Sequence, residues 1–219
     1  MIDRDFGFAP NPFHGICTLA CCKPRLRSTA QAGDWIFGVG GARLSATGRC
    51  IYGMRVEEAL TFDQYWADAR FRLKRPVRNG SRAMMLGDNI YHRDDADADW
   101  QQEDSHHSHP DGSPNRSNVD ADTRANRVLV SSHFCYFGGN ALKVPAAIFD
   151  GMGYVNGRNH RKFVLQDAEE LIRWFNVAVR GSVGTMLGDP FQFRQSAARY
   201  SAGSNRIITE HVEPVTLLV

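Results

Sequence analysis

A polar segment from Arg93 to Asn126 sets the strongest limit on how this chain can fold. Its middle reads WQQEDSHHSHPDGSP, Trp100 to Pro114, and contains almost no aliphatic side chain. A core strand or helix needs apolar residues at a period of 2 or 3.6, so we expect a long loop here. We therefore predict one domain over residues 1–219, with an acidic, histidine-containing loop inserted at residues 94–125.

The sequence outside this loop alternates short apolar runs with a few amphipathic stretches. WIFGVG, CIYGMRVEEAL and VLVSSHFCYF are typical of strands, at 35–40, 50–60 and 128–137. Thr61 is a predicted N-cap for a helix over 62–72, and Asp167 for a second helix over 168–179. Short strands mixed with two or three helices indicate an α+β fold.

Composition limits the class of protein further. The chain is 42% hydrophobic with a net charge of +2, as in ordinary globular proteins. No run of about 18 apolar residues is present, so we expect no membrane span. The N-terminus lacks the apolar core of a secretory signal, and five cysteines is an odd number. These features favour a reduced, cytoplasmic protein.

Charge is distributed unevenly along the chain. Residues 93–127 hold nine acids and four arginines, which leaves 22 basic and 15 acidic residues elsewhere. A basic run from Ala69 to Arg82 is suited to neutralising phosphates, although a solvated helix end would also carry such residues. The predicted phosphate contacts are Arg70, Arg72, Arg75, Arg78 and Arg82.

The polar loop contains the candidate chemistry. His107 and His109 share a face if the chain is extended, and free imidazole titrates near neutral pH, so a metal pair or a general base are both open. A disordered loop with an idle histidine cluster is the alternative. Trp100 favours a working loop because an exposed indole can stack on a base.

Metal and cofactor motifs are weak. His14, Cys17, Cys21 and Cys22 match no standard zinc spacing, and cysteines buried in a core are the better interpretation. GVGGAR lacks the third glycine of a dinucleotide loop and no helix follows it. We therefore predict no bound metal and no cofactor.

Several strings resemble a known family. CTLACCKPRLRSTAQAGDWIFGVGG, NGSRAMMLGDNIYHR and VLVSSHFCYFGG, with the acidic loop between the last two, resemble the nucleotide modification associated domain, type 2. The resemblance implies an association with DNA base modification in phages or bacteria. It implies no particular reaction and assigns no catalytic residue.

A weaker resemblance concerns the fold. AGDWIFGVGG followed by GRCIYGMRVEEALTFDQYW is similar to the start of PUA-like barrels, including the EVE and ASCH groups. It implies a small mixed or antiparallel β-barrel that holds a flipped or modified base.

These observations leave three functions open. The first is recognition of a nucleotide, a modified base or a nucleic acid, with predicted contacts from Asp34, Trp35, Trp100, His107, His133 and Tyr136. The second is a nucleotide-modifying enzyme, in which His107 or His133 is the general base and Asp34, Asp88 or Glu103 assists it. The third is sequestration of a small nucleotide in host–phage conflict. The sequence leaves the oligomeric state open.

Overall fold

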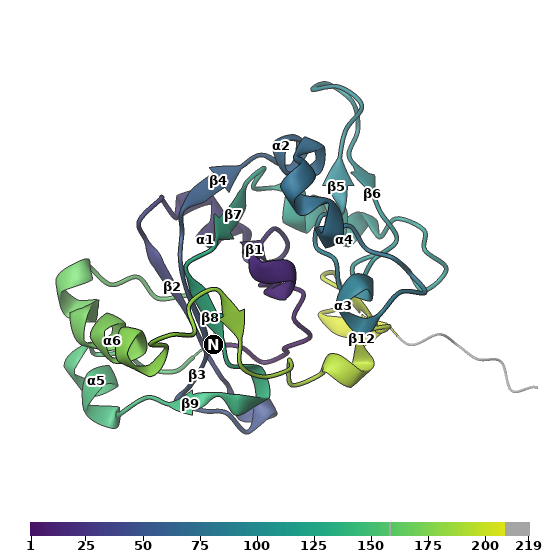
Figure 1. Ribbon diagram of the computed structural model, residues 1–219. Helices are drawn as coiled ribbons and strands as arrows, with labels where there is room; N and C mark the ends of the chain where they lie inside the picture. The colour runs from purple at the N-terminus through teal and green to yellow at the C-terminus, as the bar shows by residue number, and fades with distance from the viewer. Residues whose placement is uncertain (158, 209–219) are drawn as a thin grey trace, which may run out of the picture.

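The protein is an α+β fold in a computed structural model that describes residues 1–157 and 159–208 (Figure 1). The strands are β1 (Cys17–Leu19), β2 (Trp35–Val39), β3 (Arg49–Arg55), β4 (Glu58–Leu60), β5 (Tyr91–His92), β6 (Gln101–Gln102), β7 (Val128–Ser131), β8 (Phe134–Tyr136), β9 (Leu142–Lys143), β10 (Thr185–Met186), β11 (Arg199–Ser201) and β12 (Arg206–Ile208). The α-helices are α1 (Pro24–Thr29), α2 (Phe62–Ala67), α3 (Arg82–Met85), α4 (Arg116–Thr123), α5 (Ala146–Gly151) and α6 (Leu165–Ala178).

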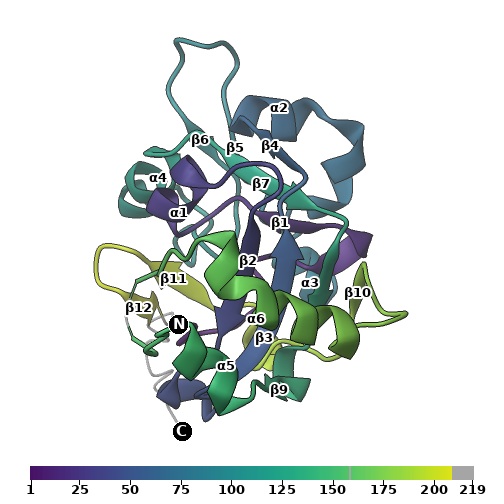
Figure 2. The ribbon, with the colours of Figure 1, turned by 90° about the vertical axis from the view of Figure 1, so that its left-hand side faces the viewer.

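The largest sheet has the order β10-β8-β3-β2, and β9 also pairs with β3. Strands β2, β3 and β8 are antiparallel neighbours, and β10 joins β8 in parallel. Helices α5 and α6 lie over one side of this sheet (Figure 2). Gly53 permits that packing, because a Cβ there would lie 2.6 Å from the ring of Phe175 on α6. Phe175 is thereby fully buried.

A second sheet has the order β1-β7-β4 and lies next to the first. Residues of both sheets, among them Leu19, Met54 and Leu129, form one buried apolar cluster. Helix α2 follows β4 and begins with the capping box of Thr61 and Gln64. The single helix predicted over 62–72 ends at Ala67, and a 3-10 helix, η3 (Ala69–Lys74), continues the chain.

The segment predicted as a loop at residues 94–125 contains two short regular elements, β6 and α4. Gln101–Gln102 pair with β5, and α4 begins after Asn115, whose side chain accepts a hydrogen bond from the Asn118 amide. Polar groups there are buried because they satisfy one another: the Gln102 amide donates to the Tyr91 hydroxyl and the His107 carbonyl. Apolar periodicity cannot detect a segment packed in this way.

The barrel expectation is corrected. Over the described residues the strands form open sheets, and none closes into the barrel that the PUA-like resemblance implies. The described part of the chain contains no helix long and apolar enough to cross a bilayer.

Candidate functional site

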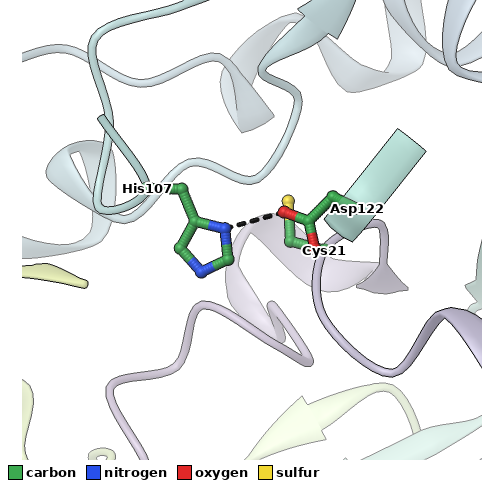
Figure 3. A group of neighbouring side chains, drawn as sticks. All are labelled: Cys21, His107 and Asp122. Carbon is green, nitrogen blue, oxygen red and sulfur yellow. Dashed lines mark hydrogen bonds and ion pairs between the residues drawn. The ribbon is translucent and has the colours of Figure 1, made fainter. Parts of the chain in front are cut away.

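Three segments far apart in sequence bring a thiol, an imidazole and a carboxylate into a line. Cys22 lies in the turn between β1 and α1, His107 in the polar segment after β6, and Asp122 on α4. The Cys22 Sγ lies 3.6 Å from Nε2 of His107. On the other side of the ring, Nδ1 donates to Oδ2 of Asp122 over 2.7 Å. Figure 3 shows this second contact, with the Nε2 edge of the ring turned away from the carboxylate.

The backbone around Cys22 is held in an unusual conformation. Cys22 and Lys23 have φ of +59° and +44°, which side-chain-bearing residues rarely adopt, and Pro24 then begins α1. Such positions persist only when the surroundings enforce them, and they cluster at functional sites. Here the Cys22 amide donates to Oδ1 of Asp122 over 2.6 Å. One carboxylate therefore fixes both the cysteine and the histidine.

Both the backbone and the ring of His107 are held in place. The backbone amide donates to the Ser105 hydroxyl, and the backbone carbonyl accepts from the side-chain amide of Asn118. The ring centroid lies 4.6 Å from that of Phe8 and 5.4 Å from that of Tyr200. These contacts fix the ring so that it faces the cysteine on one edge and the carboxylate on the other.

Electrostatics favour a charged pair in this line. Burial lowers the pKa of His107, but the charges of Asp122 and Cys22 and their hydrogen bonds outweigh it and raise the pKa to about 10. Burial raises the pKa of Asp122, and the His107 charge then brings it below its usual range. At neutral pH the ring is therefore an imidazolium, whose Nε2 lies 3.6 Å from the Cys22 sulfur.

The neighbouring His106 has the opposite character. Its Nδ1 donates to the Ala198 carbonyl over 2.5 Å. Burial and the adjacent charge of His107 lower its pKa to about 3. His106 is therefore neutral at physiological pH, and it lies against Phe6 as part of a ring-lined wall.

This arrangement opens into a cavity of about 460 Å³, which we call the Cys22 cavity. Cys22 is half-buried, whereas Cys17 and Cys21 are fully buried. The expectation of core cysteines is thus confirmed for those two and is wrong for Cys22. Besides Cys22, the described residues that line the cavity with a ring or a charged side chain are Asp3, Arg4, Phe6, Phe8, Lys23, Arg43, His106, His107, Asp122 and Tyr200.

Cys21, His107 and Asp122 also place potential metal ligands within 4.8 Å of one another (Figure 3). Their geometry suits a hydrogen bond better than an ion. Two zinc ligands at about 2.0–2.2 Å in tetrahedral geometry stand more than about 3 Å apart, which exceeds the 2.7 Å between His107 and Asp122. Burial, followed by the charges of Asp122 and Asp88, raises the pKa of Cys21 well above its usual range, which disfavours the thiolate a metal needs.

The other predicted contact residues do not gather at the Cys22 cavity. Asp34 and Trp35 line a second cavity of about 380 Å³ beside β2. Trp100 packs edge-on against Phe62, with the Arg93 guanidinium 4.3 Å above its ring. His133 lies edge-on to Trp35, and the buried Tyr136 donates to Asp5. Their nucleotide contacts stay predictions.

The two remaining candidate acids have other partners. Asp88 is fully buried and accepts from Thr18 and Tyr65. Glu103 accepts from His92 Nε2. Neither acid faces a histidine of the Cys22 cavity.

The arginine run is largely engaged with acids, carbonyls and rings. Arg70 pairs with Glu58 and Asp68 on the surface. The other contacts are Arg75 over the Trp66 ring, Arg78 with Asp104, and Arg82 near the Phe193 ring; Arg72 is exposed. Phosphate binding by this run stays a prediction.

Sequence reasoning identified His107 but missed its two partners. The signal for Cys22 was available, because Pro24 two residues later marks a helix start beside a cysteine. Asp122 was one acid among nine in the polar segment, and nothing in the pattern distinguishes it.

The fold and the site define an α+β protein in which a chain of contacts from cysteine through histidine to aspartate begins at a cavity. The chain belongs to the family of nucleotide modification associated domain 2, whose model matches residues 1–197. No curated protein and no solved structure matches the chain. The family name associates the chain with nucleotide modification.

Proposed function

We propose that this protein is a nucleotide-modifying enzyme that uses the thiolate of Cys22 as its nucleophile. The observation that carries the proposal is the unbroken line from Cys22 through His107 to Asp122, which opens into the Cys22 cavity. Nucleophile, base and orienting carboxylate within bonding reach of one another are the recurring signature of covalent catalysis.

The arrangement assigns a role to each group. The Cys22 thiolate attacks an electrophilic carbon of a nucleotide or of a group attached to it, which forms an S–C bond. As the bond from that carbon to its leaving group breaks, Nε2 of His107 gives its proton to the leaving group. Water or a second acceptor then bonds to that carbon as the S–C bond breaks, and its proton passes to Nε2 of His107, which restores the thiolate and the imidazolium. Asp122 is a positioning residue, because it holds the ring and the Cys22 amide.

Alkylation of the full chain with iodoacetamide tests the proposal. Mass spectrometry should locate the first modification at Cys22, and its rate at pH 6.5 should be close to that at pH 8.5. An ordinary thiol would react about 50-fold more slowly at the lower pH, since about half of it is ionised at pH 8.5 and only about 1% at pH 6.5. His107→Gln should restore that ordinary profile.

Cys21 is an internal control in the same peptide, because it is fully buried and should stay unmodified. The variant Cys22→Ser should lose the fast modification while keeping its fold by circular dichroism. A Cys22 that alkylates no faster than a free thiol at pH 6.5 would contradict the proposed enzyme.

The cavity walls favour nucleotide recognition as a second candidate. Tyr200 lies nearly parallel to His106, with ring centroids 6.4 Å apart and an angle of 13° between the planes. Rings of this kind can stack on a base without any reaction. Under this alternative, Cys22→Ser would bind nucleotides as tightly as the wild type, and Cys22 would alkylate as an ordinary thiol.

A further inference from the structure

The Cys22 cavity adjoins the cavity beside β2, which we call the Trp35 cavity. The two share five lining residues: Met1, Ile2, Ala9, Lys23 and Asn159. Figure 2 looks onto the side where the N-terminus and helices α5 and α6 lie together. Trp35, Phe37 and Tyr52 line the Trp35 cavity, so aromatic rings are present on both sides of the shared wall.

Cations gather at this shared wall. Lys23 lines both cavities, and Arg161 and Lys162 line the Trp35 cavity with His160. Burial lowers the pKa of His160, and the charges of Lys162, Lys23, Arg25 and Arg161 lower it further. We call Lys23, Arg161 and Lys162, which line the cavities, the cationic rim. It joins the turn at α1 to the segment before α6.

Three carboxylates line the two cavities among residues 1–157 and 159–208: Asp3, Asp34 and Asp122. Asp122 is committed to His107, and Asp34 accepts from the Gln31 amide at 2.8 Å. The cavities therefore present an excess of positive charge between aromatic walls, a combination suited to phosphate flanked by bases.

We propose that the cationic rim binds the phosphodiester of a nucleotide chain, with one nucleoside in the Cys22 cavity and its neighbour in the Trp35 cavity. This inference rests on the proposed function, because it presents the first nucleoside to the Cys22 thiolate. A mononucleotide would fill one cavity only. A phosphate held at the shared wall explains why two ring-lined cavities meet at cations next to the nucleophile.

Binding of a fluorescent single-stranded deoxyoligonucleotide to the full chain tests the rim. Lys23→Gln with Lys162→Gln should weaken binding at least tenfold, and the slope of log affinity against log salt should fall by about 1.4 units for two contacts. A deoxynucleoside monophosphate should bind more weakly and with a shallower slope. A monophosphate that binds as tightly as the oligonucleotide would overturn the phosphodiester assignment.

Matched variants separate the rim from other basic surfaces. Lys143→Gln removes an exposed lysine on β9 that lines neither cavity, and it should leave affinity unchanged. Arg72→Gln reports on the arginine run instead. If Arg72→Gln weakens binding while the Lys23 and Lys162 changes do not, the rim proposal is wrong.

A protection experiment distinguishes failure of the rim from failure of the proposed enzyme. Bound oligonucleotide should slow iodoacetamide modification of Cys22, and this protection should disappear in the Lys23→Gln, Lys162→Gln variant. Rim-dependent binding with an ordinary, unprotected Cys22 would refute the placement beside Cys22. A fast thiol with no oligonucleotide binding would leave the enzyme standing and remove the rim.

Discussion

Two polar clusters in this molecule each contain a buried aspartate, but only one of them reaches a cavity. The cavity cluster consists of Cys22, His107 and Asp122, and its thiol end reaches the Cys22 cavity. The sealed cluster consists of Thr18, Tyr65, Lys74 and Asp88, all of them buried. In the sealed cluster the carboxylate accepts from Thr18 and Tyr65, over 2.7 and 2.8 Å.

The difference lies in what satisfies each charge. Lys74 donates to three oxygens, at 2.9 and 2.6 Å on Asn11 and at 2.6 Å on Ile16, so its ammonium has a full set of acceptors. Burial of Lys74 lowers its pKa to about 8, although the charge of Asp88 opposes the shift. In the cavity cluster the last group in line is a thiol beside open space. A titratable group indicates chemistry here only when a substrate can reach it.

The largest expected effect comes from breaking the sealed cluster. Lys74→Met keeps most of the side-chain length but removes the ammonium. The Ile16 carbonyl then loses its Lys74 donor, while the two Asn11 oxygens keep the amides of Thr18 and Phe13. We expect a loss of about 3–5 kcal/mol in the free energy of unfolding, measured by urea denaturation. Lys143→Met, on an exposed lysine, should cost less than about 0.5 kcal/mol. A loss at Lys74 no larger than this control would show that the sealed cluster does not hold the fold together.

Changing the pH should have a smaller effect on the free energy of unfolding, and the sign of that effect should differ between the two clusters. The pKa of folded His107 is about 10, above the unfolded value of about 6.5, so its stabilisation is complete below pH 6.5 and is lost as pH rises towards 10. The pKa of folded Lys74, about 8, lies below the unfolded value of about 10.5, so its contribution rises with pH between these values.

The test compares stability between wild type and variant across pH. Relative to the wild type, His107→Gln should remove a decline on the order of 2–3 kcal/mol between pH 7 and 9. Lys74→Met should remove a gain above pH 8. Denaturation at fixed temperature and ionic strength measures both, and subtraction cancels the titration of groups that lie away from the two substituted residues. Slopes of the same sign in the two variants would refute the contrast.

Much of the apolar frame was predictable, while the polar site was only partly so. The strand runs at 35–40 and 128–137 and the capped helix at Phe62 follow from local patterns, which act through neighbouring residues. The cavity cluster depends on side chains 85 and 100 positions apart in sequence. No local pattern encodes that separation. His107 was predicted because a histidine side chain by itself suggests acid–base or metal chemistry, whereas Asp122 could be singled out only from the fold.

The smallest expected effect is the stability change at Cys22 itself. Its thiol faces a cavity and its backbone is strained, so Cys22→Ala removes little packing and should change the free energy of unfolding by less than about 1 kcal/mol. Cys21→Ala, at the fully buried neighbour, should cost more because it leaves a small void. Urea denaturation of the two variants side by side makes the comparison. If Cys22→Ala destabilised the protein more than Cys21→Ala, Cys22 would be a structural residue like those of the sealed cluster. Its exposure to the cavity would then no longer support a role as nucleophile.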